Sequence, residues 1–330
     1  MPAQPASHRI GRRAVLAAAS AMPLAPVVVR ASSWPDRPIR FVVPYAAGGT
    51  SDLLGRLIAN ALGPALGQTM VVENRPGGGA TVGAASVAQA APDGYTLLLG
   101  TPAVQATNRF MMASLPYDPD RAFTPIVNIM RTPNLLVVHP SVPAHSVAEL
   151  IALCKRQPDT LFFGSSGVGS TSHLAGEMLR VMAKIEIAHA PFRGTGPNVQ
   201  ALLSGEVKMS LDGMPALLPH IREGRLRLLA VTTPARYASL PDTPAVAETL
   251  PGFDAAPFNY ITGPAGLPQP IVERVNTAMN AILNEATFRS RFQELGFEPM
   301  GGTPAELAEV IRQETARWGE VIRAAGIRIE

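Results

Sequence analysis

The stretch that decides the fold is residues 39–66, IRFVVPYAAGGTSDLLGRLIANALGPAL. Its first five residues form a compact apolar run typical of a short strand, and this run ends at Pro44. Residues 45–52 form a glycine-rich loop, and the apolar residues from Leu53 to Leu66 recur at helical spacing. A strand, a glycine loop and a helix in this order predict the beginning of an open α/β sheet.

The same alternation continues along the chain and predicts two α/β blocks followed by a helical tail, each block with a parallel sheet covered by helices. The tail is too poor in strands to form a third domain, so we expect it to pack on the first block. We therefore expect a first domain from residues 32–134 and 258–330 and a second domain from 135–257, with a ligand cleft between them. The expected strands are 39–43, 70–73, 95–100, 134–139, 161–164, 185–190, 209–211, 227–231 and 260–263, and the expected helices are 53–66, 82–90, 146–155, 173–183, 199–203, 217–223, 271–284, 287–295 and 304–324.

Residues 1–31 are predicted to be an export signal and not part of the fold. A basic beginning that includes Arg12 and Arg13 precedes an apolar run over residues 14–29, and a small-residue cleavage site follows near Ala31. The adjacent arginines predict a twin-arginine signal, with an ordinary secretory leader as the alternative. Prolines interrupt the apolar run, which is also short for a membrane span.

Composition and charge argue against several classes of protein. The chain has 28 basic and 25 acidic residues, but residues 1–31 contain four arginines and no acid, which leaves 24 bases, 25 acids and a formal charge of −1. A nucleic-acid interface needs a basic stripe, and none is visible. Cys154 is the only cysteine, so an internal disulfide or a cysteine zinc site is excluded, and its apolar surroundings predict a buried thiol.

Three loops share one design and together predict an anion site. They are residues 45–52 (YAAGGTSD), 164–173 (GSSGVGSTSH) and 192–197 (FRGTGP), and each leads into a predicted helix. Glycine allows the backbone to approach a ligand closely, and a helix N-terminus presents unpaired N–H groups and the positive end of its dipole. Hydroxyl side chains add hydrogen-bond donors without adding charge. Because the loops come from both blocks, we expect them to meet in the cleft.

The loop at 164–173 resembles two familiar motifs without completing either. Gly164 and Gly169 have P-loop spacing, but Ser170 stands where a P-loop has its lysine, which argues against a nucleotide triphosphatase. No G-x-S-x-G nucleophile elbow is present. No catalytic set, metal-ligand motif or dinucleotide fingerprint emerges from the spacing, so we expect no catalytic residues, no metal and no cofactor.

Several polar residues each allow two interpretations. Asp52 either binds a ligand amine or caps a helix, and Arg193 either pairs with a ligand carboxylate or is a solvated loop residue. Asp212 lies at the cleft floor or caps a turn. His173 and His189 flank two of the loops, and without a second ligand at helical spacing we expect hydrogen-bonded structural histidines.

A series of short motifs runs along the chain after residue 31. They are VVPYAAGG (42–49) with Asp52, VENRPGGG (72–79), APDGYTLL (91–98), GVGS (167–170), HLAGE (173–177), HAPFRG (189–194), LLAVTT (228–233) and LPD (240–242). In type and order they resemble the motifs of the extracytoplasmic solute receptors of the tripartite tricarboxylate transporters, the Bug family. The resemblance spans nearly all of the chain after residue 31.

The resemblance implies a two-domain periplasmic binding protein of the type II, Venus-flytrap class that closes on a small carboxylate. It implies delivery to the membrane components of a tripartite tricarboxylate transporter. A sensor kinase is an alternative partner, and an exported enzyme on the same scaffold is the alternative from another class. We expect a periplasmic monomer with no nucleic-acid partner.

The chain departs from the family at Ala47, where proline is usual, at Arg193, where lysine is common, and over residues 101–108. These positions are expected to line the cleft, so no particular ligand is carried over. The predicted ligand-binding residues are Tyr45, Ala47, Gly48, Gly49, Thr50, Ser51, Asp52, Thr101, Gln105, Ser166, Gly169, Ser170, Thr171, His173, Arg193, Gly194, Thr195 and Asp212.

The loop design predicts that valine at Gly49 or at Gly169 abolishes ligand binding while the protein still folds and is exported, because either side chain blocks the approach of the ligand to the backbone. Binding of a carboxylate to each purified variant checks this. Wild-type affinity in both would contradict the assignment of the loops.

Overall fold

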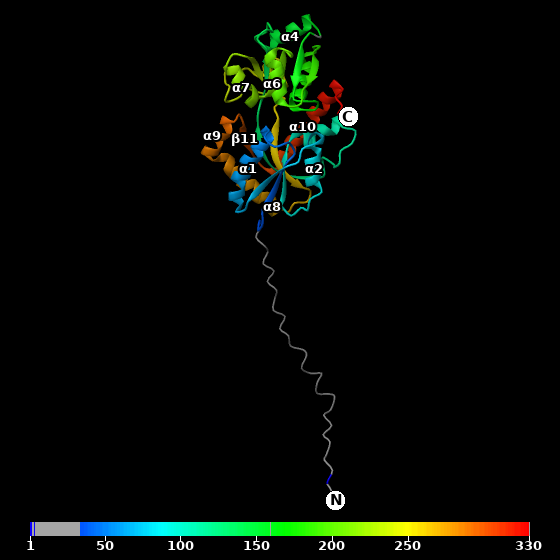
Figure 1. Cartoon of the computed structure of the whole chain (residues 1–330), viewed down its shortest axis with the longest axis vertical. Coiled ribbons are helices and arrows are strands. Elements are labelled where there is room, and N and C mark those ends of the chain that lie inside the picture. Colours follow the sequence, from blue (N-terminus) through cyan, green and yellow to red (C-terminus); the bar gives the residue numbers. More distant parts are fainter. Residues whose placement is uncertain (2, 4–33, 159, 330) are drawn as a thin grey trace. The chain divides into compact units, whose positions relative to one another are not determined.

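The structure is a computed structural model that describes residues 34–158 and 160–329, together with residues 1 and 3 (Figure 1). The predicted export signal at 1–31 lies outside these ranges, apart from residues 1 and 3. None of the helices within them is both long and apolar enough to cross a membrane.

A six-stranded sheet organises what we call the first lobe. Its strand order is β11-β4-β10-β3-β1-β2. The apolar face of the sheet packs on α1 and α8, and α2 covers the opposite face beside β1 and β3. The strands are β1 (Ile39–Val43), β2 (Met70–Asn74), β3 (Thr96–Gly100), β4 (Phe123–Arg131), β10 (Phe258–Pro264) and β11 (Glu298–Gly301).

A five-stranded sheet organises the second lobe, which carries α4, α6 and α7 in Figure 1. Its strand order is β7-β6-β8-β5-β9. The strands are β5 (Asn134–Val138), β6 (Phe162–Ser165), β7 (Ala188–Pro191), β8 (Met209–Gly213) and β9 (Arg227–Val231). The helices of both lobes are α1 (Thr50–Leu66), α2 (Thr81–Ala88), α3 (Asn108–Met111), α4 (Val147–Arg156), α5 (Thr171–Ala183), α6 (Thr195–Ser204), α7 (Met214–Arg222), α8 (Gln269–Asn284), α9 (Ala286–Glu294) and α10 (Pro304–Ala325).

The α/β class is confirmed, but the expectation of purely parallel sheets is wrong. β1 is parallel to β2 and β3, whereas β10 is antiparallel to both β3 and β4. In the second sheet β5 is antiparallel to β8 and β9. The reason is the path of the chain. The chain leaves the first lobe after β4 and returns to it at β10, so these neighbouring strands run in opposite directions.

The sequence analysis missed some elements of the first lobe. β4 contains Pro125, and proline argues against a central strand because it lacks an N–H for the ladder. β11 is short and contains Pro299. A π-helical turn over Ala103–Thr107, followed by α3, was also not predicted, and rare π-turns have no clear pattern in a single sequence.

The helix α10 packs on both lobes. The sequence analysis expected the tail to pack on the first block only. It packs on β4 and on the π-helical turn of the first lobe. Its residues Trp318, Val321 and Ile322 also join Leu174 and Met178 of α5 in one buried core cluster. The helix therefore connects the lobes in addition to the two stretches of chain between the sheets.

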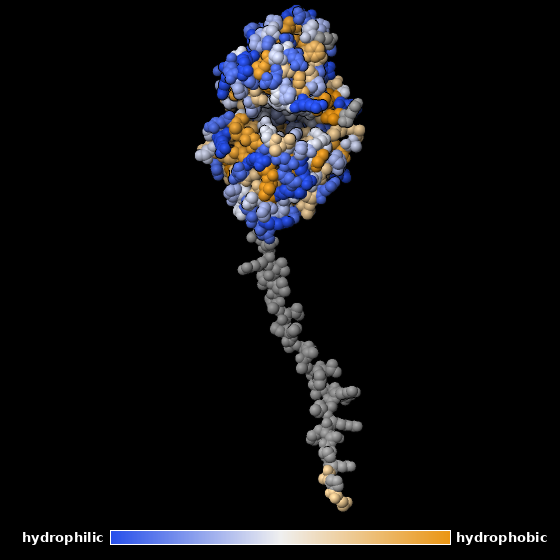
Figure 2. Space-filling view, in the orientation of Figure 1, coloured by the Kyte–Doolittle hydropathy of each residue, from blue (hydrophilic) through white to orange (hydrophobic). Residues whose placement is uncertain are grey.

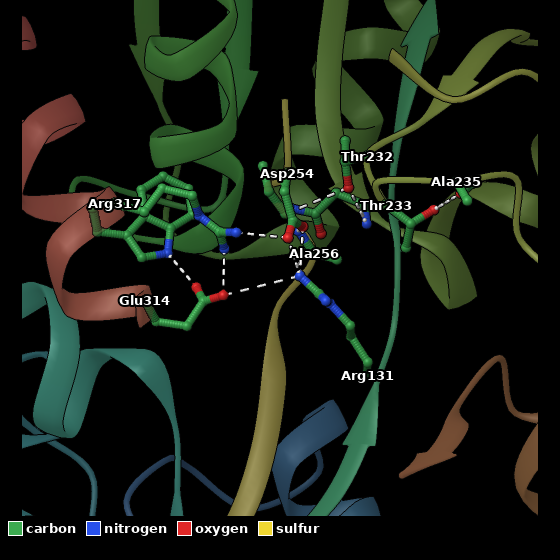
Figure 3. A network of polar contacts seen from close by, with 11 residues as sticks. Arg131, Thr232, Thr233, Ala235, Asp254, Ala256, Glu314 and Arg317 are labelled. Atoms are coloured by element: carbon green, nitrogen blue, oxygen red, sulfur yellow. Dashed lines mark hydrogen bonds and ion pairs between the residues drawn. The ribbon is translucent and has the colours of Figure 1, made fainter. Parts of the chain in front are cut away.

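A network of four charged side chains lies where these connections meet (Figure 3). Arg131, at the end of β4, donates to Asp254, which lies just before β10. Arg317 of α10 donates to Asp254 at 2.6 Å and also pairs with Glu314. The network therefore joins the outgoing crossing, the returning crossing and α10.

Glu314 is the most buried member of this network, with 8 % of its side chain exposed. Burial raises the pKa of its carboxyl group, although Arg317 and Arg131 act in the opposite direction. Its Oε2 accepts a hydrogen bond from the indole Nε1 of Trp318 at 2.9 Å. A buried charge or hydrogen-bond donor without a partner destabilises the fold, so each side chain of the network is stabilised by the opposite charges and acceptors of the others.

We expect Glu314→Gln to lower the free energy of unfolding by roughly 1–3 kcal/mol, because Arg317 loses a charged partner while remaining partly buried. Urea unfolding of the purified protein measures the loss. Glu320→Gln, at an exposed position of the same helix, is the matched control and should change stability little. Equal effects of the two substitutions would show that the network does not support the connection between the lobes.

Candidate functional site: a cleft between two lobes

A cleft of about 680 Å³ lies between the lobes, and Figure 2 shows the surface hollowed there. This volume lies within the range of roughly 300–1,000 Å³ found for small-molecule sites. Residues from all three predicted loops line it. The predicted residues in its wall are Tyr45, Ala47, Gly48, Gly49, Thr50, Ser51, Thr101, Ser166, Ser170, Thr171, Gly194, Thr195 and Asp212.

Asp52 stabilises the first loop by accepting hydrogen bonds. Its Oδ2 accepts hydrogen bonds from the backbone N–H of Gly48 at 2.9 Å and from Arg56 Nε at 3.1 Å. The hydrogen bond from Gly48 is the largest of the effects that lower the pKa of Asp52. Gly49 is the N-cap of α1, so the first-turn N–H groups of this helix are at the cleft wall without intrahelical acceptors.

The second loop ends at Ser170, the N-cap of α5. The Ser170 hydroxyl accepts from the His173 N–H at 3.2 Å and donates to the Gly167 carbonyl at 2.6 Å. Ser172 Oγ accepts from the Ser166 N–H at 2.9 Å. These bonds bring the N-terminus of α5 and the Ser166 side of the loop to the cleft.

A pair of stacked histidines supports the second loop. The rings of His173 and His189 lie 3.8 Å apart between centroids, at 15°. His173 Nδ1 accepts from the Gly169 N–H at 3.0 Å, and His189 Nε2 lies 2.6 Å from Ser165 Oγ. Burial is the main cause that lowers the pKa of His173 to about 3 and that of His189 to about 4. Both rings are therefore neutral near pH 7.

The third loop leads into α6 and joins Asp212 at the cleft. Gly194 is the N-cap of α6, and the Thr195 hydroxyl donates to Asp212 Oδ1 at 3.4 Å. Asp212 also accepts from Asn198 Nδ2 and from the Gly213 N–H, each at 2.8 Å. Burial raises the pKa of Asp212, which these donors oppose.

The electrostatic character of the cleft comes from helix ends and hydroxyls. Among the described residues that line it, Asp212 is the one with a formal charge, and none is a lysine or an arginine. The N-terminal residues of α1, α5 and α6 all line this cleft. Their dipoles and free N–H groups favour an anion, so the cleft can bind one without a basic side chain.

The structure places several predicted site residues outside this wall. Asp52 supports the first loop, and His173 supports the second. Gln105 donates to the Pro119 carbonyl at 3.3 Å and lines a separate groove under α10. Arg193 is exposed and is not among the residues that line the cleft. Gly169 lines a small adjoining cavity instead.

The two glycines chosen for substitution are not equivalent. Gly49 has φ −87°, and a Cβ there would meet only the Ala46 carbonyl at 3.8 Å. Gly169 has φ +77°, and a Cβ there would lie 2.5 Å from Ile329 Cδ1. Gly49→Val is therefore the more direct test of the cleft, because a side chain at Gly169 also strains the backbone and the packing of the C-terminal segment.

The sequence analysis missed the wall contributed by the crossings between the lobes. Thr132, Asn134, Pro257 and Asn259 line the cleft from these stretches. Asn134 is 1 % exposed, and its Nδ2 has no partner among the described residues. No local pattern marks these residues, because only the path of the chain between the two sheets brings them to the cleft. Ala46 and Pro102 belong to segments that were expected at the cleft, whereas the further lining residues that were not predicted are Met130, Gly213, Pro215, Ala216, Phe258 and Phe297.

Two sheets, with an anion-favouring cleft between them, define the class of a two-domain α/β binding protein, and solved structures agree. A protein of R. palustris with adipate is 40 % identical, with a TM-score of 0.81 over 89 % of this chain and 99 % of its own. MatC of Rhodopseudomonas palustris with bound malate is 33 % identical, with a TM-score of 0.75 over 87 % and 99 %. The periplasmic binding protein BugD is 31 % identical, with a TM-score of 0.77 over 90 % and 100 %.

Residues 54–327 match the tripartite tricarboxylate transporter family receptors, and the chain belongs to this family. The resemblance to the Bug family and the two-domain periplasmic binding protein fold are thereby confirmed. The family consists of solute receptors, which agrees with the expectation of a binding protein.

The histidine pair predicts a loss of stability in acid. In the unfolded chain these histidines titrate near the ordinary value of 6.5, whereas in the fold their pKa values are about 3 and 4. The stability that the neutral rings provide is therefore complete above pH 6.5 and is lost as the pH falls toward 4. The thermal midpoint at pH 7.5 and at pH 5 measures this loss.

His189→Gln keeps an acceptor for Ser165 but cannot gain a proton, so its midpoint should fall less between these two pH values. The exposed His145→Gln is the control and should behave like the wild type. A variant at position 189 with the full wild-type pH dependence would contradict the role of the pair.

Proposed function

We propose that the protein is a periplasmic solute-binding protein that captures a small carboxylate in the cleft and delivers it to a tripartite tricarboxylate-type membrane transporter. The observation that carries this proposal is the meeting of the N-termini of α1, α5 and α6 in one cleft without a basic side chain. This arrangement suits a small anion that is held by backbone N–H groups and hydroxyls.

The carboxylate class is supported by relatives. The R. palustris structure contains adipate, and MatC contains malate. Both compounds are dicarboxylates with short chains, and the cleft volume of about 680 Å³ suits ligands of this size. Asp212 at the wall provides a hydrogen-bond acceptor for a hydroxyl or amino group, or a donor when it is protonated.

The two lobes are proposed to act as domains that close on the ligand, with boundaries at 134/135 and 257/258. The sheets change between Arg131 and Asn134 and again between Val231 and Phe258. These crossings lie beside the charge network, which holds them against α10. A rotation about this region would change the width of the cleft while each sheet stays intact.

Export through a twin-arginine signal at residues 1–31 and a monomeric state belong to the same proposal. The proposed location is supported by the family, in which BugD is a periplasmic binding protein. The proposed transporter partner is supported by membership in a family of transporter receptors.

We expect adipate, succinate or malate to raise the thermal midpoint of the purified protein. Stabilisation grows with concentration and reaches about 2.7 kcal/mol at 100 times the dissociation constant. Adipamide has the same length but no charge, and it should have little effect because the helix ends select an anion. A screen of dicarboxylates, aromatic acids and amino acids then identifies the strongest ligand.

Recovery of the ligand after incubation separates binding from catalysis, since a binding protein returns the acid unchanged. Equal stabilisation by adipate and adipamide, or none by any acid, would contradict the carboxylate site. Uptake of the best ligand by cells with and without the gene tests delivery, and unchanged uptake would count against a transport role.

A further inference from the structure

A small side pocket adjoins the cleft next to the N-terminus of α5. Its volume is about 60 Å³, which is roughly the space of two water molecules in the liquid. It shares several wall residues with the cleft, among them Tyr45, Ser170, Thr171 and Pro257. A group bound at the N-terminus of α5 would therefore lie beside the side pocket.

The part of the side pocket away from the cleft is mostly apolar, although Thr107 also lines it. Ala255 and Ala256 of the returning crossing, Leu174 of α5 and Trp318 of α10 form its apolar wall, and each is at most 4 % exposed. The indole Nε1 of Trp318 donates to Glu314, so its hydrogen-bonding capacity is satisfied within the charge network. The ring of Trp318 is thus available for apolar contact.

Two of the hydroxyl groups at the entrance are already paired with each other. The hydroxyls of Tyr45 and Thr101 lie 3.2 Å apart and bond to each other, and Tyr260 donates to the Thr101 carbonyl at 3.1 Å. None of the lining residues, all of which the structure describes, has a buried side-chain nitrogen or oxygen without a partner. Bound water needs two to four polar partners, so this pocket favours an apolar group.

We propose that the side pocket is a specificity subsite that receives a methyl- or ethyl-sized group on the carbon next to the bound carboxylate. This inference rests on the proposed carboxylate-binding function. The carboxylate lies at the N-terminus of α5, its apolar substituent enters the pocket between Ala256 and Trp318, and the remainder of the ligand occupies the cleft. Short alkyl-substituted carboxylates are therefore preferred over their unsubstituted analogues.

The test compares succinate, methylsuccinate and phenylsuccinate by calorimetric titration of the wild-type protein. Burial of one methyl group should make methylsuccinate bind about fourfold more tightly than succinate. Phenylsuccinate should gain nothing, because a phenyl group is too large for about 60 Å³. Wild-type protein that binds succinate and methylsuccinate equally would overturn the subsite.

Ala256→Val fills the pocket and should abolish or reverse the preference for methylsuccinate while succinate still binds. Ala281→Val makes the same chemical change at an exposed position of α8, outside both the cleft and the side pocket. This control should keep the fourfold preference. If Ala256→Val kept the fourfold preference for methylsuccinate, the methyl group would have to bind outside the side pocket.

A second measurement does not depend on the folding of a pocket variant. The chain has two tryptophans, and Trp34→Phe leaves Trp318 as the reporter in the pocket. Methylsuccinate should shift the emission of this protein more than succinate does, and identical emission at saturation with both would contradict the inference. Failure of every acid to bind would instead contradict the proposed function, and the side pocket with it.

Discussion

The ion-pair network of Arg131, Asp254, Glu314 and Arg317 is the constraint on which the arrangement of the lobes depends. Two stretches of chain and α10 pass between the lobes, and the network joins all three (Figure 3). Two guanidinium groups and two carboxylates balance each other in a partly buried place, so each charge would be costly without the others. The network also positions the residues beside it. Ala255, Ala256 and Pro257, which follow Asp254, and Trp318, which follows Arg317, line the side pocket, and Pro257 lines the cleft as well.

The cleft favours an anion through the geometry of its wall and not through net charge. A lysine or arginine in the wall would attract many anions from a distance and would pay a desolvation cost in an enclosed site. Backbone N–H groups at helix ends carry partial charges that are already oriented, and they add no mobile side chain. The supporting residues lie one layer behind the wall, where Asp52 holds the first loop and the stacked His173 and His189 hold the second.

Much of the site could be predicted because its loops are local in sequence. Glycines and hydroxyl residues directly before a helix indicate an anion-binding end wherever the rest of the chain lies, so residues 45–51, Ser166, Ser170 and Thr171 were found from the pattern. Asn134 and Pro257 were not found, because they reach the cleft only through the path of the chain between sheets. Asp52 and His173 were included among the predicted ligand-binding residues with a structural role as the alternative, and in the structure their polar atoms accept from loop amides. Sequence identifies the residue type at such positions but not the direction of the side chain.

The sequence by itself determined the α/β class, the glycine loops and the family, because strand and helix periodicity and helix-end chemistry are properties of neighbouring residues. Only the tertiary structure decided that the sheets are mixed, that α10 connects both lobes, and that Trp318, Ala256 and Leu174 enclose one small cavity. These features depend on contacts between residues far apart in the chain, such as Arg131 with Asp254 and α5 with α10. Burial and charge compensation select such contacts among many compact alternatives, and no local pattern records that selection.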